Sequence, residues 1–175
     1  MKIPIIFSTV TGNAFKIADK IKDGVEDKCG PYNIRYITDE VIDMFDTFIL
    51  VYWCDFSSAD KDTLELISKM KNKNILILGT AGVPMDSVVA PMILENVNEV
   101  VKKDNNLLGH FLCQGSIDLA RTFRRLKHVD ESKPKLSLEK FESYMNISNL
   151  PNETQLNDAL EFVIDKLGRK FTLKD

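Results

Sequence analysis

The start of the chain passes from an apolar run to a helical pattern across one short loop. Residues 2–7, KIPIIF, are a short and mainly apolar run of the kind that forms a buried strand. The apolar residues that follow recur at the spacing of one helix face and are Ile17, Ala18, Ile21 and Val25. The loop Ser8–Ala14 must therefore connect a strand directly to a helix. This constraint favours a βα architecture.

The sequence of this loop, STVTGNA, is suited to binding an anion. Thr9, Thr11 and Asn13 provide side-chain donors, and Gly12 allows a close approach to the backbone. The first turn of a helix also leaves backbone N–H groups unpaired at the positive end of the helix dipole. Because the loop contains no Lys or Arg, it favours a phosphate held by neutral donors. The alternative is a capped βα turn without a ligand.

Two common nucleotide-binding motifs are absent from the sequence. It contains neither G-x-x-x-x-G-K-[ST] nor G-x-G-x-x-G. These absences argue against a nucleoside triphosphate or a dinucleotide at the Ser8–Ala14 loop.

Apolar runs and helical patterns alternate along the rest of the chain. Further strands are expected at 33–37, 47–53, 74–78 and 107–113, and helices at 60–71, 87–103, 137–145 and 153–167. The run at 47–53 shows no polar alternation, as expected of a parallel strand that is covered on both faces. The sequence therefore predicts an α/β fold with a parallel sheet and helices on both faces.

Composition narrows the class of protein. With 175 residues and 44% apolar side chains, the chain is expected to form a single domain, 1–175. A net charge of −3 argues against nucleic-acid binding, and no apolar run is long enough to span a membrane. Three widely spaced cysteines and two histidines provide no metal site, and the odd cysteine count favours a cytoplasmic location.

The segment 6–14 resembles the FMN-phosphate loop of flavodoxins. It follows the pattern hydrophobic–aromatic–x–[ST]–x–T–G–N, here Ile6-Phe7-Ser8-Thr9-Val10-Thr11-Gly12-Asn13-Ala14. One departure is Ala14, where flavodoxins usually have Thr, so one side-chain hydroxyl that could bind the phosphate is missing. The resemblance implies a doubly wound five-stranded sheet of order 2-1-3-4-5. It also implies FMN at the switch point between strands 1 and 3.

In such a sheet three strand exits, Ser8–Ala14, Tyr52–Ala59 and Thr80–Asp86, would form one FMN site. The residues predicted to bind the cofactor are Thr9, Val10, Thr11, Gly12, Asn13, Ala14, Tyr52, Trp53, Cys54, Phe56, Thr80, Ala81 and Gly82. Trp53 is predicted to stack on the flavin, with Tyr52 or Phe56 nearby. The alternative for Trp53 is a residue that closes the edge of the core.

The second loop lacks a feature that many flavodoxins have. They often carry a Gly there, whose peptide flips when the flavin takes up its first electron. The segment 54–57, CDFS, has no Gly, and a left-handed conformation costs another residue roughly 1–2 kcal/mol. We therefore expect weaker stabilisation of the one-electron-reduced flavin.

Three functions are consistent with this sequence. The resemblance implies a low-potential electron carrier, a cytoplasmic monomer that accepts electrons from a reductase. It would pass them to a flavoenzyme or an iron–sulfur protein. The first alternative is an FMN-dependent NAD(P)H:quinone or flavin reductase, and the second is a flavin-free interaction module.

Other polar residues have structural interpretations that compete with functional ones. Cys54 and Cys113 are expected to be buried as small hydrophobic residues, and His110 to lie at a strand edge. The basic residues between 119 and 135 form a charged surface segment or bind an acidic partner or a cofactor's 2′-phosphate. They are Arg121, Arg124, Arg125, Lys127, His128, Lys133 and Lys135.

Overall fold

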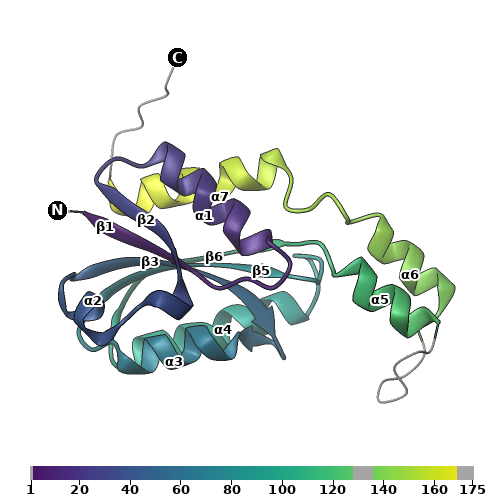
Figure 1. Cartoon of the computed structure of the whole chain (residues 1–175), viewed down its shortest axis with the longest axis horizontal. Coiled ribbons are helices and arrows are strands. Elements are labelled where there is room, and N and C mark those ends of the chain that lie inside the picture. Colours follow the sequence, from purple (N-terminus) through teal and green to yellow (C-terminus); the bar gives the residue numbers. More distant parts are fainter. Residues whose placement is uncertain (1, 128–135, 169–175) are drawn as a thin grey trace.

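The computed structural model describes residues 2–127 and 136–168. Its centre is a sheet of five parallel strands in the order β2-β1-β3-β5-β6 (Figure 1). These strands are β1 (Ile3–Phe7), β2 (Lys28–Asn33), β3 (Thr47–Asp55), β5 (Asn74–Ala81) and β6 (Asn106–Gln114). A two-residue strand, β4 (Ser58–Ala59), pairs antiparallel with the end of β3. Without β4 the order is the predicted 2-1-3-4-5.

Helices cover both faces of this sheet (Figure 1). One face packs against α1 (Asn13–Gly24) and α7 (Glu153–Leu167), and the other against α3 (Lys61–Lys69) and α4 (Val89–Lys102). Each central strand divides its side chains between the two layers. In β3, Val51 faces the layer of α1 and α7, whereas Leu50 faces that of α3 and α4. Burial on both faces explains why the apolar runs show no polar alternation.

The second strand differs from its prediction. It spans Lys28–Asn33, and the expected strand 33–37 is instead mostly a 3₁₀ turn, η1 (Ile34–Tyr36). The Gly30–Pro31 pair lies inside the strand and does not precede it, at an irregularity in the pairing with β1. An edge strand tolerates this pair because the missing N–H of proline is not needed on its unpaired side. Sequence patterns cannot distinguish an edge strand from a central one.

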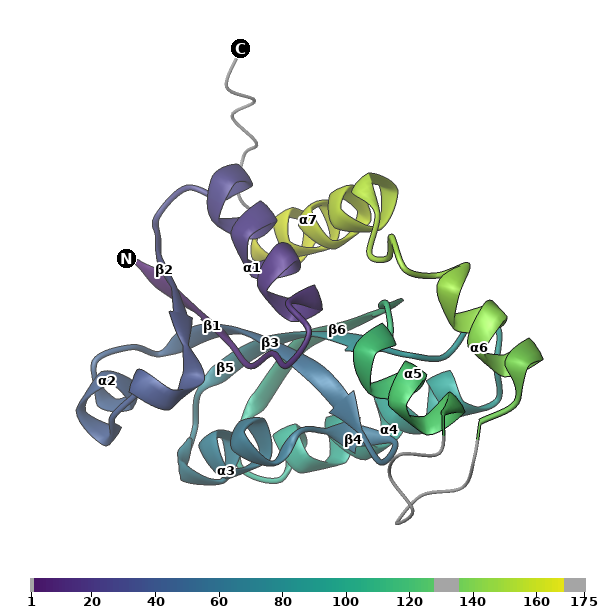
Figure 2. The same ribbon diagram turned by 45° about the vertical axis from the view of Figure 1, so that its right-hand side comes forward.

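The remaining helices lie at the periphery. They are α2 (Asp39–Asp43), α5 (Leu119–Leu126) and α6 (Leu138–Met145). Figures 1 and 2 show α5 and α6 side by side at one end of the sheet, where the rings of Phe123 and Phe141 have centroids 6.0 Å apart. Residues 128–135 of the basic segment lie outside the described part. Within the described ranges no helix is long and apolar enough to cross a lipid bilayer.

A partly buried polar network lies between the sheet and α4. The Tyr52 hydroxyl donates to Nε2 of His110 at 2.9 Å, and Nδ1 of His110 lies 2.9 Å from Oδ1 of Asn98. Because the amide oxygen only accepts, Nδ1 carries the proton and Nε2 is the acceptor. A Cβ at Gly79 would overlap the Tyr52 ring, so this glycine makes room for the network.

This network makes the stability of the fold dependent on pH. Burial lowers the pKa of His110 to about 4, against an ordinary value of 6.5. A lowered pKa in the folded state stabilises the fold above the unfolded pKa, and this contribution is lost as the pH falls towards 4. Between about pH 7.5 and pH 5, the unfolding free energy should fall by about 2 kcal/mol through this residue. Urea unfolding of the wild type and of His110→Gln at both pH values measures the difference. An equal change in unfolding free energy between the two pH values in both proteins would contradict the prediction.

Candidate functional site

A cavity of about 320 Å³ opens at the carboxyl ends of the strands. It is lined by the three predicted loops together with residues from the β6–α5 loop, α5 and α6. The lining residues are Val10, Thr11, Asn13, Trp53, Cys54, Thr80, Ala81, Gly82, Ser116, Ile117, Asp118, Thr122 and Tyr144. Segments from four strand exits therefore meet in one hollow at the switch between β1 and β3.

The first loop ends in an open helix terminus. Gly12 is the N-cap of α1 with φ +88°, and its N–H donates to Oγ1 of Thr9 at 3.0 Å. Since glycine has no side chain to cap the helix, the first turn of α1 is left accessible to an anion. Any side chain at this position would strain the backbone.

Hydrogen bonds at both ends fix this loop in place. At its start Ser8 Oγ donates to Oδ1 of Asp60, the N-cap residue of α3, at 2.8 Å. At its end Asn13 Nδ2 donates to the Ser116 carbonyl at 2.8 Å, and Ser116 Oγ donates to Asn13 Oδ1 at 2.9 Å. The oxygen and the nitrogen of the Asn13 side chain are thus both engaged within the protein. The role of Asn13 is to join the first loop to the β6–α5 loop.

Trp53 separates two hollows. It lines the main cavity, and with Val10 it also lines a smaller one of about 120 Å³ that reaches Thr9 and Arg35. Trp53 therefore contributes an aromatic side chain to the wall of the main cavity, where a stacking residue is needed.

The second loop is a tight β-hairpin. Cys54 pairs with Ala59 and Asp55 with Ser58, and the two residues at the tip, Phe56 and Ser57, have φ of 45° and 60°. Positive φ at both positions is the signature of a type I′ turn, which usually contains Gly or Asn. Asn96 Nδ2 on α4 donates to the Ser57 carbonyl at 2.8 Å and holds the tip against that helix.

This hairpin stores strain that glycine would relieve. Replacing Ser57 by Gly removes the left-handed penalty, so Ser57→Gly should raise the unfolding free energy by about 0.5–1 kcal/mol. The control Ser58→Gly, one residue further in β4, should lower it by about the same amount because glycine weakens a strand. Chemical denaturation measures both. A loss of stability in Ser57→Gly would contradict a strained turn.

Five predicted site residues do not line the main cavity. Tyr52 and Ala14 are fully buried in opposite layers of the core, and Gly12 lies between two lining residues. Thr9 lines the smaller hollow, and Phe56 is 97% exposed at the hairpin tip. Strand alternation separates Tyr52 from Trp53, because neighbouring side chains point to opposite faces.

Sequence reasoning missed the fourth side of the cavity. Ser116, Ile117, Asp118, Thr122 and Tyr144 lie in the β6–α5 loop, α5 and α6. Thr122 is buried and its hydroxyl donates to the Asp118 carbonyl at 2.6 Å. The signal was the Gln114–Gly115 exit of the last strand, which opens at the same sheet edge as the others. Tyr144 lies on α6 and does not follow a strand, so the positions of the strand ends could not predict it.

The two cysteines near the site are not thiolates at neutral pH. Burial raises the pKa of Cys54, although N–H groups of Ser57 and Ser58 partly oppose this. Burial raises the pKa of Cys113 to about 12. Both therefore behave as small, partly or fully buried side chains and not as nucleophiles.

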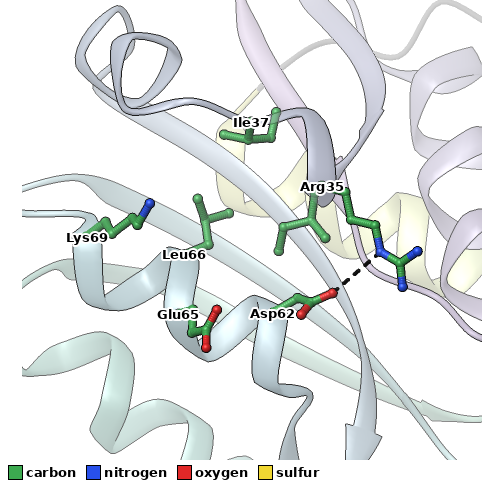
Figure 3. Close-up of a pocket in the computed structure, with 7 residues that line it drawn as sticks. Arg35, Ile37, Asp62, Glu65, Leu66 and Lys69 are labelled. Carbon is green, nitrogen blue, oxygen red and sulfur yellow. Dashed lines mark ion pairs between the residues drawn. The ribbon is translucent and has the colours of Figure 1, made fainter.

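A second groove, between η1 and α3, lacks the features of a binding site. Figure 3 shows that Arg35 and Asp62 face each other across it, with Nε and Oδ2 3.8 Å apart. Its other lining residues are Ile34, Ile37, Glu65, Leu66 and Lys69. Exposed ion pairs of this length contribute little. Among the described residues, no group of His, Cys, Asp and Glu side chains is arranged to hold a metal ion.

Comparison with known proteins shows which family has this fold and this arrangement of loops. A family model described as "Flavodoxin domain" matches residues 4–164. A flavodoxin-like domain-containing protein, BilS of Clostridioides difficile, is 33% identical over 119 residues, which cover 67% of this chain and 68% of that protein.

Solved flavodoxins share the fold at low sequence identity. Oxidised flavodoxin 1 of Bacillus cereus superposes with a TM-score of 0.60 at 11% identity, covering 96% of this chain and 98% of that one. Oxidised flavodoxin 2 of the same organism gives 0.60 at 13%, covering 96% and 99%. The flavodoxin of Streptococcus pneumonia TIGR4 gives 0.58 at 12%, also covering 96% and 99%.

Proposed function

Since the chain belongs to the flavodoxin family, we propose that it binds FMN in the main cavity and carries electrons at low potential between partner redox proteins. The observation that supports this most directly is the meeting of the three strand-exit loops in one cavity, with Trp53 in its wall. Ligands of doubly wound sheets bind at this switch point.

The chemistry of the cavity fits FMN. The amino-terminal turn of α1, with Gly12 as an uncapped N-cap, suits the phosphate group. Trp53 offers a ring face for a flat aromatic system, and the Thr80–Gly82 backbone offers polar groups for its pyrimidine edge. When bound, the flavin supplies the electron transfer, while the protein holds it and sets its potential.

The protein's own contribution is a rigid frame. Ser8 and Asn13 fix the first loop at both ends, and Asn96 fixes the hairpin that carries Trp53. A fixed frame reduces the ordering cost of binding and keeps the ligand in one orientation.

An FMN-dependent NAD(P)H reductase is the second candidate. The observation that favours it is the fourth side of the cavity, where Thr122 and Tyr144 add a wall beyond the three loops. Side chains of this kind can hold a hydride donor or a small acceptor beside the flavin, provided that one flavin face stays open.

The visible spectrum of the purified protein, before and after addition of FMN, NADH and NADPH under anaerobic conditions, separates these functions. A yellow protein that ignores both nucleotides but is reduced by a flavodoxin reductase supports the carrier. Rapid bleaching by a nucleotide alone supports the reductase. A colourless protein that takes up no FMN overturns both.

Two substitutions in the same hairpin test the site. Trp53→Ala should weaken FMN binding about tenfold, because it removes a stacking wall worth roughly 0.5–1.5 kcal/mol beyond its buried area. Phe56→Ala should leave the affinity unchanged, since Phe56 points into solvent. Quenching of flavin fluorescence measures both affinities. Equal losses in the two variants would place the flavin elsewhere.

A further inference from the structure

The short helix α5 carries a charge opposite to that of the chain around it. Residues 119–127 contain Arg121, Arg124, Arg125 and Lys127 and no acidic residue. Because the whole chain has a net charge of −3 and this segment contributes +4, the remaining residues carry −7. A basic segment on an acidic protein gives it a strong charge asymmetry, which orients partners before contact.

The helix α5 lies beside the cavity. Thr122 is buried and lines the cavity, whereas Arg124 and Lys127 are exposed. Lys127 Nζ lies 5.5 Å from the centroid of the Phe123 ring, so cation and ring form one surface. Because an α-helix is about 10 Å across, a protein bound to this surface lies within roughly one helix diameter of the cavity.

Apolar side chains are exposed on the same segments that line the cavity. Val10, which lines the cavity, is 64% exposed, and Phe123 and Met145, the neighbours of the lining residues Thr122 and Tyr144, are 47% and 48% exposed. Aromatic, Met and Arg side chains are enriched at protein–protein interfaces. This mixture of apolar and basic side chains matches the composition of protein–protein interfaces.

From these observations we propose that Arg124 and Lys127 on α5, together with the exposed apolar residues Val10, Phe123 and Met145 of the segments that line the cavity, form the docking surface for an acidic redox partner protein. The proposal rests on the proposed electron-carrier function. The partner presents a carboxylate-rich surface with an apolar centre, which brings its redox centre to the mouth of the cavity. Electrostatic attraction of this kind raises the association rate and is weakened by salt.

Two forms of one electron acceptor test the proposal. Native cytochrome c has a basic surface, and its succinylated form carries carboxylates in place of the lysine charges. Stopped-flow oxidation of the reduced FMN-loaded protein by each form gives two rate constants at low and at high salt. We expect the succinylated form to react faster at roughly 10 mM salt, and the advantage to disappear at roughly 0.5 M.

Charge reversal identifies the surface responsible. The pair Arg124→Glu and Lys127→Glu should slow the succinylated acceptor about tenfold at low salt. The control pair Lys102→Glu and Lys103→Glu makes the same change in charge at the exposed carboxyl end of α4, which leads into the start of β6 and so lies away from the cavity. It should change the rate less than about twofold. Similar effects of the two pairs would overturn the proposal.

Two further measurements distinguish protein docking from flavin binding and from membrane binding. Isothermal titration of succinylated cytochrome c into the protein does not need flavin, so docking is measured even if no FMN binds and the proposed function fails. Retention of FMN and an unchanged circular dichroism spectrum verify that each variant folds. Sedimentation with phosphatidylserine-containing vesicles, abolished by the Arg124 and Lys127 pair while the cytochrome rates stay unchanged, would assign the surface to a membrane and overturn the proposal.

Discussion

Burial of the sheet on both faces is the constraint from which the site follows. Strands such as β3 and β5 have no polar face, so helices must cover both sides of the sheet. Because the strands are parallel, every crossover must also bring the chain back to the end of the sheet where the strands begin. Parallel strands then release their loops together at their carboxyl ends. A cavity forms where the order reverses between β1 and β3, because crossovers leave from there to opposite faces. Packing of apolar residues therefore decides where polar chemistry can occur.

Local patterns are sufficient to predict the central strands and the long helices, because burial gives these strands unbroken apolar runs and these helices a strong apolar periodicity. They are insufficient at the edge of the sheet, where β2 accommodates Gly30–Pro31 inside a strand. The site divides in the same way. The three loops were predictable from strand exits, whereas the exclusion of Tyr52 and Phe56 required the pleat and the hairpin geometry.

The contribution of α5 and α6 lay beyond sequence reasoning for a physical reason. These helices pack mainly against each other, through Phe123 and Phe141, and carry a thin apolar stripe among many charges. Periodicity is weak when so little of a helix is buried. That Tyr144 reaches the cavity depends on how the pair is held between β6 and α7, and no single segment encodes this.

The geometry of the site depends on three separate anchors. Asp60 caps α3 and also receives the Ser8 hydroxyl, Asn13 exchanges two hydrogen bonds with Ser116, and Asn96 supports the hairpin. Each joins a loop to an element that belongs to the packed core or follows the last strand. Loops that would otherwise be mobile thus acquire the precision of the sheet.

The exchange between Asn13 and Ser116 has a thermodynamic consequence. It joins the turn at the start of α1 to the segment that leads into α5, so a ligand that ordered one of them would also order the other. Coupling of this kind is reciprocal: a partner that tightens the hold on an anion at α1 is itself bound more tightly when that anion is present, by the same factor. Binding of the anion at α1 and binding of the partner near α5 would then share a single coupling free energy.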